Sequence, residues 1–275
     1  MEYDLTQQSY QAFASFLQQK LGIVLGDNRQ YLVKSRLSAL ARDHNVSDIN
    51  AFLKDVVAIK DRALTDKCLE LMTTNETFWF RDQHPFDLLH QHVLPLYQGS
   101  KNKLRIWSSA CASGQEPYSI AITVKEFKQQ YPQAFSQGVE IIATDYSSKM
   151  VAHASKGIYD ELALSRGLSQ QLRRRYFTAV NDKSMQVNDT VKNMVSFQRL
   201  NLLGDYSSLG TFDIVFCRNV LIYFNRDEKT KILKKIAASL HNSGTLFLGA
   251  AESISGAESL FKMQSVAKGL YYTKP

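Results

Sequence analysis

Long apolar runs are missing from this chain of 275 residues. No stretch of about 18 consecutive apolar residues occurs, so the sequence predicts no helix that crosses a membrane. The first residues, MEYDLTQQ, are acidic and polar, and they lack the basic and apolar regions of a signal peptide. We therefore expect a cytoplasmic protein without membrane insertion.

Metal-binding patterns are equally scarce. Cys68, Cys111 and Cys217 lie far apart and form no Cys-x-x-Cys pair, which argues against a disulfide framework and a thiolate zinc site. His90 and His92 are the nearest pair of histidines, but residues two apart point to different sides of a helix. The sequence therefore predicts no metal site.

Positive charge is what the chain has in excess. It holds 33 Lys and Arg against 26 Asp and Glu, a net charge of +7, which suits a nucleic acid, an acidic membrane surface or an acidic protein. Residues 29–42 carry four cations and no acid, and Arg173–Arg175 form a second cluster. The first cluster lies on a predicted helix face, where most charges are only solvated, and Arg36 borders the apolar stripe and could cover the core.

Helical patterns alone fill the chain up to about residue 73. Apolar residues recur at helical spacing from Tyr10 to Leu21, and Gly26-Asp27 predicts a stop and the cap of the next helix. Ser47 predicts the cap of a third helix, and a fourth is expected from about Asp61 to Met72. We therefore expect an all-helical N-terminal domain, residues 1–73.

Strands and helices alternate after residue 100. The expected strands are Lys103–Trp107, Val139–Thr144, Phe212–Cys217 and Thr245–Ala250, and the expected helices between them are Pro117–Gln130, Ser147–Lys156 and Arg226–Leu240. This alternation predicts crossover connections and a mostly parallel sheet.

Two segments break the alternation. Phe261–Val266 and Gly269–Thr273, split by Ala267-Lys268, have the pattern of a hairpin, so the last strand is expected to be antiparallel. Residues Thr178 to Phe197 hold Asn-Asp turn signals and short β-branched runs, which predict a small antiparallel insertion.

Polar or small residues follow three of the predicted strands, where an open parallel sheet binds its ligand. IWSSACASGQEPYS contains only Gly114 as glycine, so it lacks the GxGxxG pattern and a Walker lysine of phosphate binders; it could also be a generic turn. Asp145 ends the next strand, where an acid commonly binds ribose hydroxyls, although Asp145 or Ser147 could simply start a helix.

The third strand end is FDIVFCRNVLIYF, in which Arg218 and Asn219 follow a hydrophobic strand. The two residues could be a structural pair that holds the loop, since buried polar groups need partners. Taken together, the three strand ends indicate a nucleoside site without phosphates, a combination that points to S-adenosylmethionine.

Six stretches resemble one family, the bacterial chemotaxis receptor methyltransferases, or CheR family. They are MTTNETFWFRD, WSSACASGQEPYSIA, ATDYSSKMVAHASKGIY, LRRRYF, RLNLL and FDIVFCRNVLIYF. The resemblance implies a Rossmann-like α/β methyltransferase fold over residues 74–275, with a β-subdomain at about 176–198, and a receptor-docking helical domain before it. Phe78, Trp79 and Phe80 are expected to pack the junction of the two domains.

The same resemblance implies that a methyl group passes from S-adenosyl-L-methionine to glutamate side chains on the cytoplasmic helical bundle of chemoreceptors. The products would be a glutamate γ-methyl ester and S-adenosyl-L-homocysteine. Carried over by motif, the cofactor residues are Asn75, Thr77, Arg81, Glu116, Asp145, Asn201, Leu202, Arg218 and Asn219. Asn75, Thr77 and Arg81 would contact the methionine part, and Glu116 and Asp145 would bind the amino and ribose groups. Asn201 and Leu202 would frame the adenine, and Arg218 and Asn219 would line the pocket.

Arg81 and Tyr223 would also lie near the transferring methyl group and serve catalysis. Receptor docking is implied for Arg36, in KSRL, and less strongly for Arg29, Lys34 and Arg42. Family members that bind a short aromatic peptide at the receptor C-terminus carry a glycine-rich loop in the β-subdomain. FTAVNDKSMQVND has no glycine, so we expect an enzyme that works without this tether. We also expect a monomer.

Two other classes fit parts of the sequence. A nucleic-acid methyltransferase would share the fold and suit the charge. However, the chain has no Asx-Pro-Pro-aromatic motif and no Pro-Cys pair, so we expect no nucleic-acid substrate. A scaffold that kept the pocket but lost turnover is the second alternative, and the presence of Arg81, Asp145, Arg218 and Tyr223 together argues against it.

Overall fold

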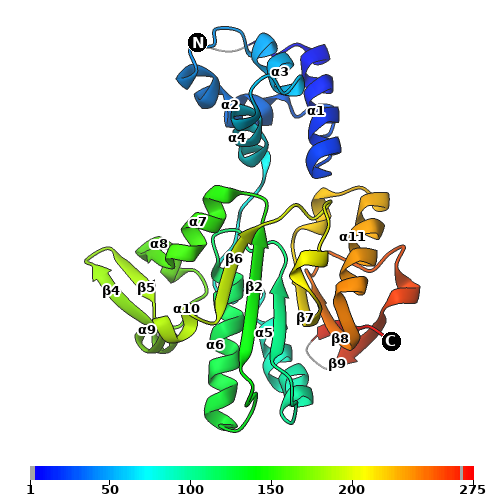
Figure 1. The fold of residues 1–275 in the computed structure, drawn as a ribbon. Coiled ribbons are helices and arrows are strands. Elements are labelled where there is room, and N and C mark those ends of the chain that lie inside the picture. The colour runs from blue at the N-terminus through cyan, green and yellow to red at the C-terminus, as the bar shows by residue number, and fades with distance from the viewer. Residues whose placement is uncertain (1–3, 267–268) are drawn as a thin grey trace. The chain divides into compact units, whose positions relative to one another are not determined.

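The computed structural model describes residues 4–266 and 269–275 (Figure 1). The chain divides into two compact units: one reaches from the N-terminus to Thr74 and adds Tyr223–Glu228, and the other comprises Asn75–Ile222 and Lys229–Pro275. In the part of the chain that is described, no helix combines the length and apolarity that a membrane span requires.

The first unit is helical, as the sequence predicts. Its helices are α1 Gln7–Leu21, α2 Gln30–Asp43, α3 Ile49–Val57 and α4 Arg62–Met72 (Figure 1). The apolar stripe predicted from Tyr10 to Leu21 is buried, with Phe13 and Leu17 fully inaccessible to solvent. This stripe forms the core of the unit because residues three and four apart lie on one helix face.

Two helix boundaries in this unit differ from the prediction. α1 ends at Gly22 rather than near Gly26, because Gly22 adopts a left-handed φ of 71° and its N–H bonds the Gln18 carbonyl at 2.7 Å. Ser47 does not cap α3, since Asp48 accepts a hydrogen bond from the Asn50 N–H at 2.8 Å instead. Asp61 caps α4, where a helix start is predicted.

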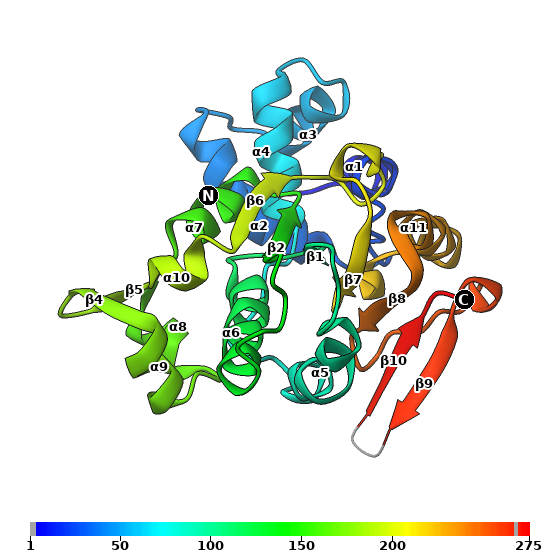
Figure 2. The same cartoon turned by 60° about the horizontal axis from the view of Figure 1, so that its bottom comes forward.

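The second unit is built on a seven-stranded sheet in the order β6-β2-β1-β7-β8-β10-β9 (Figure 2). The strands are β1 Leu104–Ser108, β2 Val139–Asp145, β6 Val195–Arg199, β7 Phe212–Cys217, β8 Leu240–Leu248, β9 Lys262–Val266 and β10 Gly269–Thr273. β6, β2, β1, β7 and β8 are parallel, and β10 is antiparallel to β8 and β9, so the predicted mostly parallel sheet with an antiparallel last strand is confirmed. The predicted hairpin break at 267–268 lies outside the described residues.

Helices precede and connect these strands. They are α5 His84–Leu88, α6 Gln115–Gln130, α7 Ser148–Lys156 and α11 Arg226–Ser239, with the short helices η3 Ser207–Leu209, η4 Leu221–Tyr223 and η5 Glu258–Leu260. α5 continues as the π-helix η1 Leu89–Val93 and the 3₁₀-helix η2 Leu94–Tyr97, so this helical segment changes its winding twice.

A three-stranded antiparallel sheet forms the β-subdomain. It consists of β3 Ile158–Asp160, β4 Phe177–Asn181 and β5 Ser184–Val187, and it is accompanied by α8 Glu161–Ser165, α9 Gln170–Tyr176 and α10 Asp189–Lys192. β6 follows these elements but pairs with β2 of the large sheet, so residues 195–198 of the predicted insertion belong to that sheet.

The Arg173–Arg175 cluster anchors α9 to its neighbours. Arg173 binds the Glu161 carboxylate through both of its terminal nitrogens, at 2.6 and 2.5 Å. Arg175 binds Glu126 of α6 at 2.8 Å. Two of the three cations are therefore engaged in ion pairs within the unit.

The aromatic run after residue 77 packs inside the second unit. Trp79 is fully buried, and the rings of Tyr159 and Phe177 meet it edge-on at 5.0 and 5.1 Å. Phe80 packs edge-on against Phe86 at 5.3 Å. Trp79 and Phe80 thus belong to the core of this unit.

Candidate functional site

Three neighbouring strands bring their carboxyl ends together in the second unit. β1 lies between β2 and β7, and Ser108 at its end is aligned with Ala143 of β2 and Phe216 of β7. Because all three strands are parallel, the residues that follow them gather at one edge of the sheet. The strand-end candidates from the sequence therefore lie at one site.

Arg218 is the centre of the charge network at this edge. Its side chain is 1% exposed and forms ion pairs with Asp82 at 2.8 Å and Glu116 at 3.0 Å. It also donates to the Arg81 carbonyl at 2.9 Å, whereas its buried Nε has no hydrogen-bond partner among the described residues. The guanidinium thus ties the loop that precedes α5 to the start of α6 and leaves one donor unused.

Glu116 lies in the first turn of α6, where the helix dipole favours a negative charge. Its Oε1 accepts a hydrogen bond from the Ser108 hydroxyl at 2.8 Å, and its Oε2 accepts one from Arg218. Burial raises the pKa of Glu116, while Arg218 and Ser108 act in the opposite direction. Both carboxylate oxygens are therefore already oriented.

Asp145, at the end of β2, joins two loops. Its Oδ2 accepts a hydrogen bond from the Ala112 N–H at 2.9 Å, and its Oδ1 accepts one from the Ser147 N–H at 2.9 Å. Ser147 caps α7, so the alternative expectation that Ser147 starts a helix is also met in the structure. The positive φ of Ala112, 46°, shows that the loop after β1 bends sharply to reach Asp145.

The stretch from Asn75 to Asp82 has strained backbone next to Arg81. Phe80 and Asp82 have φ values of 49° and 65°, which non-glycine residues rarely adopt. Arg81 donates to the Glu76 carbonyl at 3.0 Å and lies over the Phe78 ring at 5.5 Å. Asn75, Thr77 and Arg81 are all partly exposed, so they can meet a ligand.

Asn201 and Leu202 follow β6, whose last residue Arg199 is aligned with Asp145. The Leu200 N–H donates to the Asp145 carbonyl at 2.9 Å, which holds this segment at the same sheet edge. Asn201 accepts a hydrogen bond from the Leu203 N–H at 2.9 Å, and Leu202 is buried.

The predicted docking residues lie in the first unit. Arg36 donates to the Met72 and Thr73 carbonyls at 2.6 and 3.0 Å, so it holds the end of α4. Arg29 and Arg42 are exposed at the two ends of α2, and Lys34 is partly exposed. Tyr223 also belongs to this unit, where its carbonyl accepts from the Val24 N–H at 3.2 Å.

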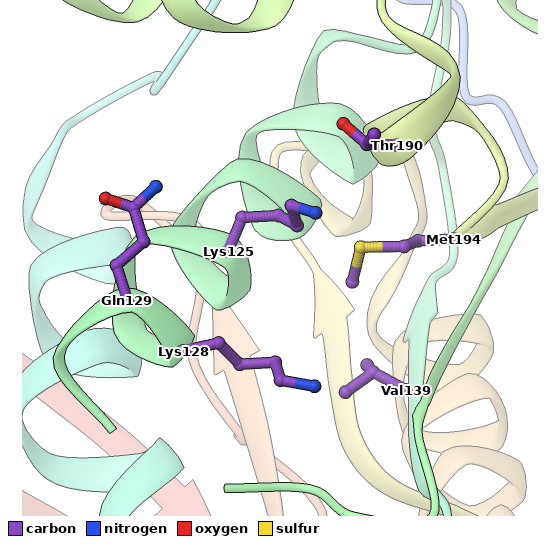
Figure 3. Close-up of a pocket in the computed structure, with 6 residues that line it drawn as sticks. All are labelled: Lys125, Lys128, Gln129, Val139, Thr190 and Met194. Atoms are coloured by element: carbon purple, nitrogen blue, oxygen red, sulfur yellow. The ribbon is translucent and has the colours of Figure 1, made fainter. Parts of the chain in front are cut away.

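A separate surface pocket lies at the opposite edge of the sheet, where β2 begins and α6 ends. It measures about 380 Å³ and is lined by Lys125, Lys128, Gln129, Val139, Thr190 and Met194. Both lysine side chains extend toward Val139 and Met194 (Figure 3). None of the predicted site residues lines this pocket.

Sequence reasoning missed three residues of the strand-end network: Asp82, Ser108 and Glu252. Asp82 is 136 positions from its partner Arg218, so no local pattern could reveal the pair. Glu252 accepts hydrogen bonds from the backbone of the loop after β7. Ser108 is the last residue of β1, which lies one residue later in the chain than the predicted strand Lys103–Trp107.

The fold and the side chains at this edge define a class of protein. A mostly parallel sheet with an antiparallel last strand, and an acid at the end of the second strand, are the features of S-adenosylmethionine-dependent methyltransferases. The carboxylates of Asp82, Glu116 and Asp145 suit a ligand that carries a sulfonium, an ammonium and ribose hydroxyls. The residues present therefore fit this cofactor.

Comparison with known proteins identifies the family. The description "CheR methyltransferase, SAM binding domain" matches residues 75–270, and "CheR methyltransferase, all-alpha domain" matches residues 8–73. The chain belongs to the CheR methyltransferase family.

Full-length relatives agree with this assignment. "Chemotaxis protein methyltransferase 1" of Vibrio cholerae is 47% identical over 98% of this chain and 97% of its own length. The chemotaxis protein methyltransferase of Salmonella typhimurium is 32% identical over 91% and 85%. The magnesium protoporphyrin IX methyltransferase of Synechocystis, solved with bound SAM, is 15% identical over 79% of this chain and 93% of its own, with a TM-score of 0.38 that is too low to support a conclusion.

Proposed function

We propose that this chain methylates glutamate side chains on the cytoplasmic helical bundle of chemoreceptors and so serves adaptation in chemotaxis. The observation that carries the proposal is its full-length similarity to chemotaxis protein methyltransferases, both CheR domains included. S-adenosylmethionine is the methyl donor, and S-adenosylhomocysteine and a glutamate γ-methyl ester are the products.

The side chains at the site suit this reaction because it needs no strong base. A glutamate carboxylate has an ordinary pKa of about 4.3 and is already ionised near neutral pH. A bound cofactor would supply an activated methyl group, which the carboxylate oxygen would take up as the carbon–sulfur bond breaks and its electron pair stays on sulfur. No proton moves, so the enzyme mainly aligns the two reactants and excludes water.

The reactive thiols of other methyltransferases have no counterpart at this edge. Burial is the largest cause of the raised pKa values of Cys111 and Cys217, which keeps both thiols protonated. A nucleophilic cysteine is therefore not part of the proposed mechanism.

Each group at the site has a proposed role. Asp145 accepts hydrogen bonds from the ribose, and Glu116 accepts one from the amino group through its remaining lone pairs. Asn75, Thr77 and Arg81 contact the methionine part. Asn201 and Leu202 frame the adenine, and Arg218 and Asn219 line the pocket. Tyr223 is proposed to hydrogen-bond the incoming carboxylate, a role that rests on the resemblance alone.

Receptor docking is proposed for the cations of α2. Arg29, Lys34 and Arg42 have no ion-pair partner in the described part of the chain, so they are free to meet an acidic helical bundle. Arg36 contributes charge at the same helix while it holds α4. The docked enzyme is proposed to act as a cytoplasmic monomer.

The β-subdomain is proposed to work without a receptor tether. β4 and β5 are joined at Asp182 and Lys183, with no glycine in the turn. Calorimetry with an aromatic receptor pentapeptide tests this, and binding in the micromolar range or tighter would contradict it.

Radiolabelled S-adenosylmethionine and receptor-containing membranes test the main proposal. Base-labile label on receptor glutamates is expected, because a carboxyl methyl ester hydrolyses in base. Label on DNA would support a nucleic-acid methyltransferase instead. A protein that binds the cofactor but labels nothing would support a scaffold.

A further inference from the structure

Glu252 lies in the loop after β8, next to the loop that follows β7, because Leu248 and Cys217 are aligned neighbours in the sheet. Its carboxylate accepts hydrogen bonds from the N–H groups of Asn219 at 2.8 Å and Gly249 at 2.7 Å through Oε2. Through Oε1 it accepts bonds from Val220 at 2.8 Å, Leu221 at 2.6 Å and Ile222 at 3.3 Å.

This arrangement leaves Glu252 balanced by backbone dipoles alone. No cation pairs with it in residues 4–266 and 269–275. Four consecutive N–H groups, from residue 219 to residue 222, point at one carboxylate, which satisfies the free donors at the start of η4. One carboxylate thus accepts the backbone N–H groups of four successive loop residues.

Gly249 and Asn219 show that the contact is close-packed. A Cβ on Gly249 would lie 2.6 Å from Glu252 Oε2 and 2.9 Å from the Asn219 backbone nitrogen. Asn219 has a left-handed φ of 57°, which Asn tolerates better than most residues. The loop therefore adopts a left-handed backbone conformation at a residue whose N–H Glu252 holds.

The side chain of Asn219 is the part of this loop that can serve a ligand. It is half-buried, and its amide makes no hydrogen bond to any residue that the structure describes. Arg218, directly before it, carries the equally unused Nε. Buried and half-buried donors without protein partners are expected where a ligand supplies the acceptor.

We propose that Glu252 is a positioning residue of the methyltransferase, whose carboxylate holds residues 219–222 in the conformation that presents Asn219 to the cofactor. The inference rests on the proposed placement of Asn219 at the cofactor. Glu252 itself touches only protein, so it acts through the loop.

Three variants in a double-mutant cycle test the inference: E252Q, N219A and the double variant. In E252Q an amide NH₂ replaces one of the two carboxylate oxygens. Depending on the orientation of the amide, either the two N–H groups that bond Oε2 or the three that bond Oε1 lose their acceptor, so the loop is expected to shift. The dissociation constant of S-adenosylhomocysteine, measured by calorimetry, is expected to rise about tenfold or more in E252Q. The dissociation constant of the double variant is expected to lie within about threefold of that of the weaker-binding single variant, because both changes remove the same proposed contact between Asn219 and the cofactor.

Glu258→Gln is the matched control, because Glu258 is a nearby acid that accepts from the Gly256 N–H at 3.0 Å. E258Q is expected to bind the product as the wild type does. If E252Q does not fold, E252D, which keeps the negative charge, takes its place, and the same changes in the dissociation constant are expected.

The positioning role alone would be overturned if E252Q bound S-adenosylhomocysteine as tightly as the wild type, or lost only as much affinity as E258Q. It would also be overturned if the affinity losses of the two single variants multiplied in the double variant. Unchanged binding in N219A would show that Asn219 is not a cofactor residue, which overturns the proposed site and the inference with it. All of these readouts use only cofactor binding, so they do not depend on the identity of the methyl acceptor.

Discussion

At the scale of single residues, the site is a set of charged side chains held by short contacts, in which Glu116, Asp145 and Arg218 are buried and Asp82 is exposed. Arg218 bridges the exposed Asp82 and the buried Glu116, which limits the cost of burying its guanidinium. Asp145 spends both oxygens on backbone N–H groups of neighbouring loops. The carboxylates are thus oriented before a ligand arrives, and this lowers the cost of binding one.

Replacement of Asp145 by alanine is the first prediction. D145A removes the acceptor for the Ala112 and Ser147 N–H groups and the proposed acceptor for the ribose. Calorimetry with S-adenosylhomocysteine is expected to show binding weakened roughly tenfold or more. D160A is the control, since Asp160 also accepts a backbone N–H, from Ala163 at 2.8 Å, but caps α8 in the β-subdomain. Equal affinity of D145A and D160A would contradict the assignment.

Replacement of Glu116 by glutamine changes how stability depends on pH. Burial raises the pKa of Glu116 in the folded state, so the protonated carboxyl favours folding below its ordinary pKa. This contribution is lost as pH rises through the raised pKa. The stability of the wild type minus that of E116Q, from urea unfolding, is expected to fall as pH rises above the ordinary glutamate pKa of about 4.3. A difference that is flat or rises with pH would show that the Arg218 ion pair outweighs burial.

At the scale of elements, loops rather than helices decide the geometry of the site. Trp79 donates its backbone N–H to the Arg166 carbonyl at 3.1 Å, so the loop between α8 and α9 rests on the aromatic run before the site. Gly167 makes this possible. Its φ is +87°, and a Cβ there would lie 1.9 Å from the Trp79 carbonyl oxygen.

Gly167→Ala is therefore expected to destabilise the second unit by more than about 1 kcal/mol, through both the strained φ and the clash. Thermal and urea unfolding measure the loss. G99A is the matched control, because nothing lies within 4 Å of a Cβ at Gly99. Equal stability of the two variants would mean that the loop moves aside without cost.

At the scale of the whole molecule, the excess of positive charge has a specific location to test. The chain carries +7, and the cations of α2 include exposed Arg29 and Arg42. By contrast, two of the arginines in the Arg173–Arg175 cluster are engaged in ion pairs. The proposed receptor surface is thus the helix of the first unit and not the longest basic run in the sequence.

Charge reversal on α2 tests this surface. R29E and R42E are each expected to lower the rate of receptor methylation by roughly tenfold or less, with an effect that shrinks as salt increases, and to leave cofactor affinity unchanged. K54E, an exposed lysine on α3, is the control. R36E is expected also to lower stability, because Arg36 holds the Met72 and Thr73 carbonyls. Loss of cofactor binding in R29E or R42E would contradict the docking role.

The sequence by itself determined the elements and their order. Hydrophobic periodicity and capping residues predicted four helices and then alternating strands, because burial and hydrogen bonding within a turn act over a few residues. The position of Asp145 at a strand end and the motif around Arg218 were readable for the same reason. Asp145 and Arg218 were expected to lie near each other because the carboxyl ends of parallel strands lie on the same side of the sheet.

Only the tertiary structure decided which side chains meet. Arg218 finds Asp82 and Glu116 over 136 and 102 positions, Glu252 reaches the loop after β7 over 33 positions, and Arg36 reaches the end of α4. No local pattern encodes such partners, because they depend on strand order and on loop bends at Asp82, Ala112 and Asn219. The first unit likewise includes Tyr223–Glu228, which no sequence pattern indicated.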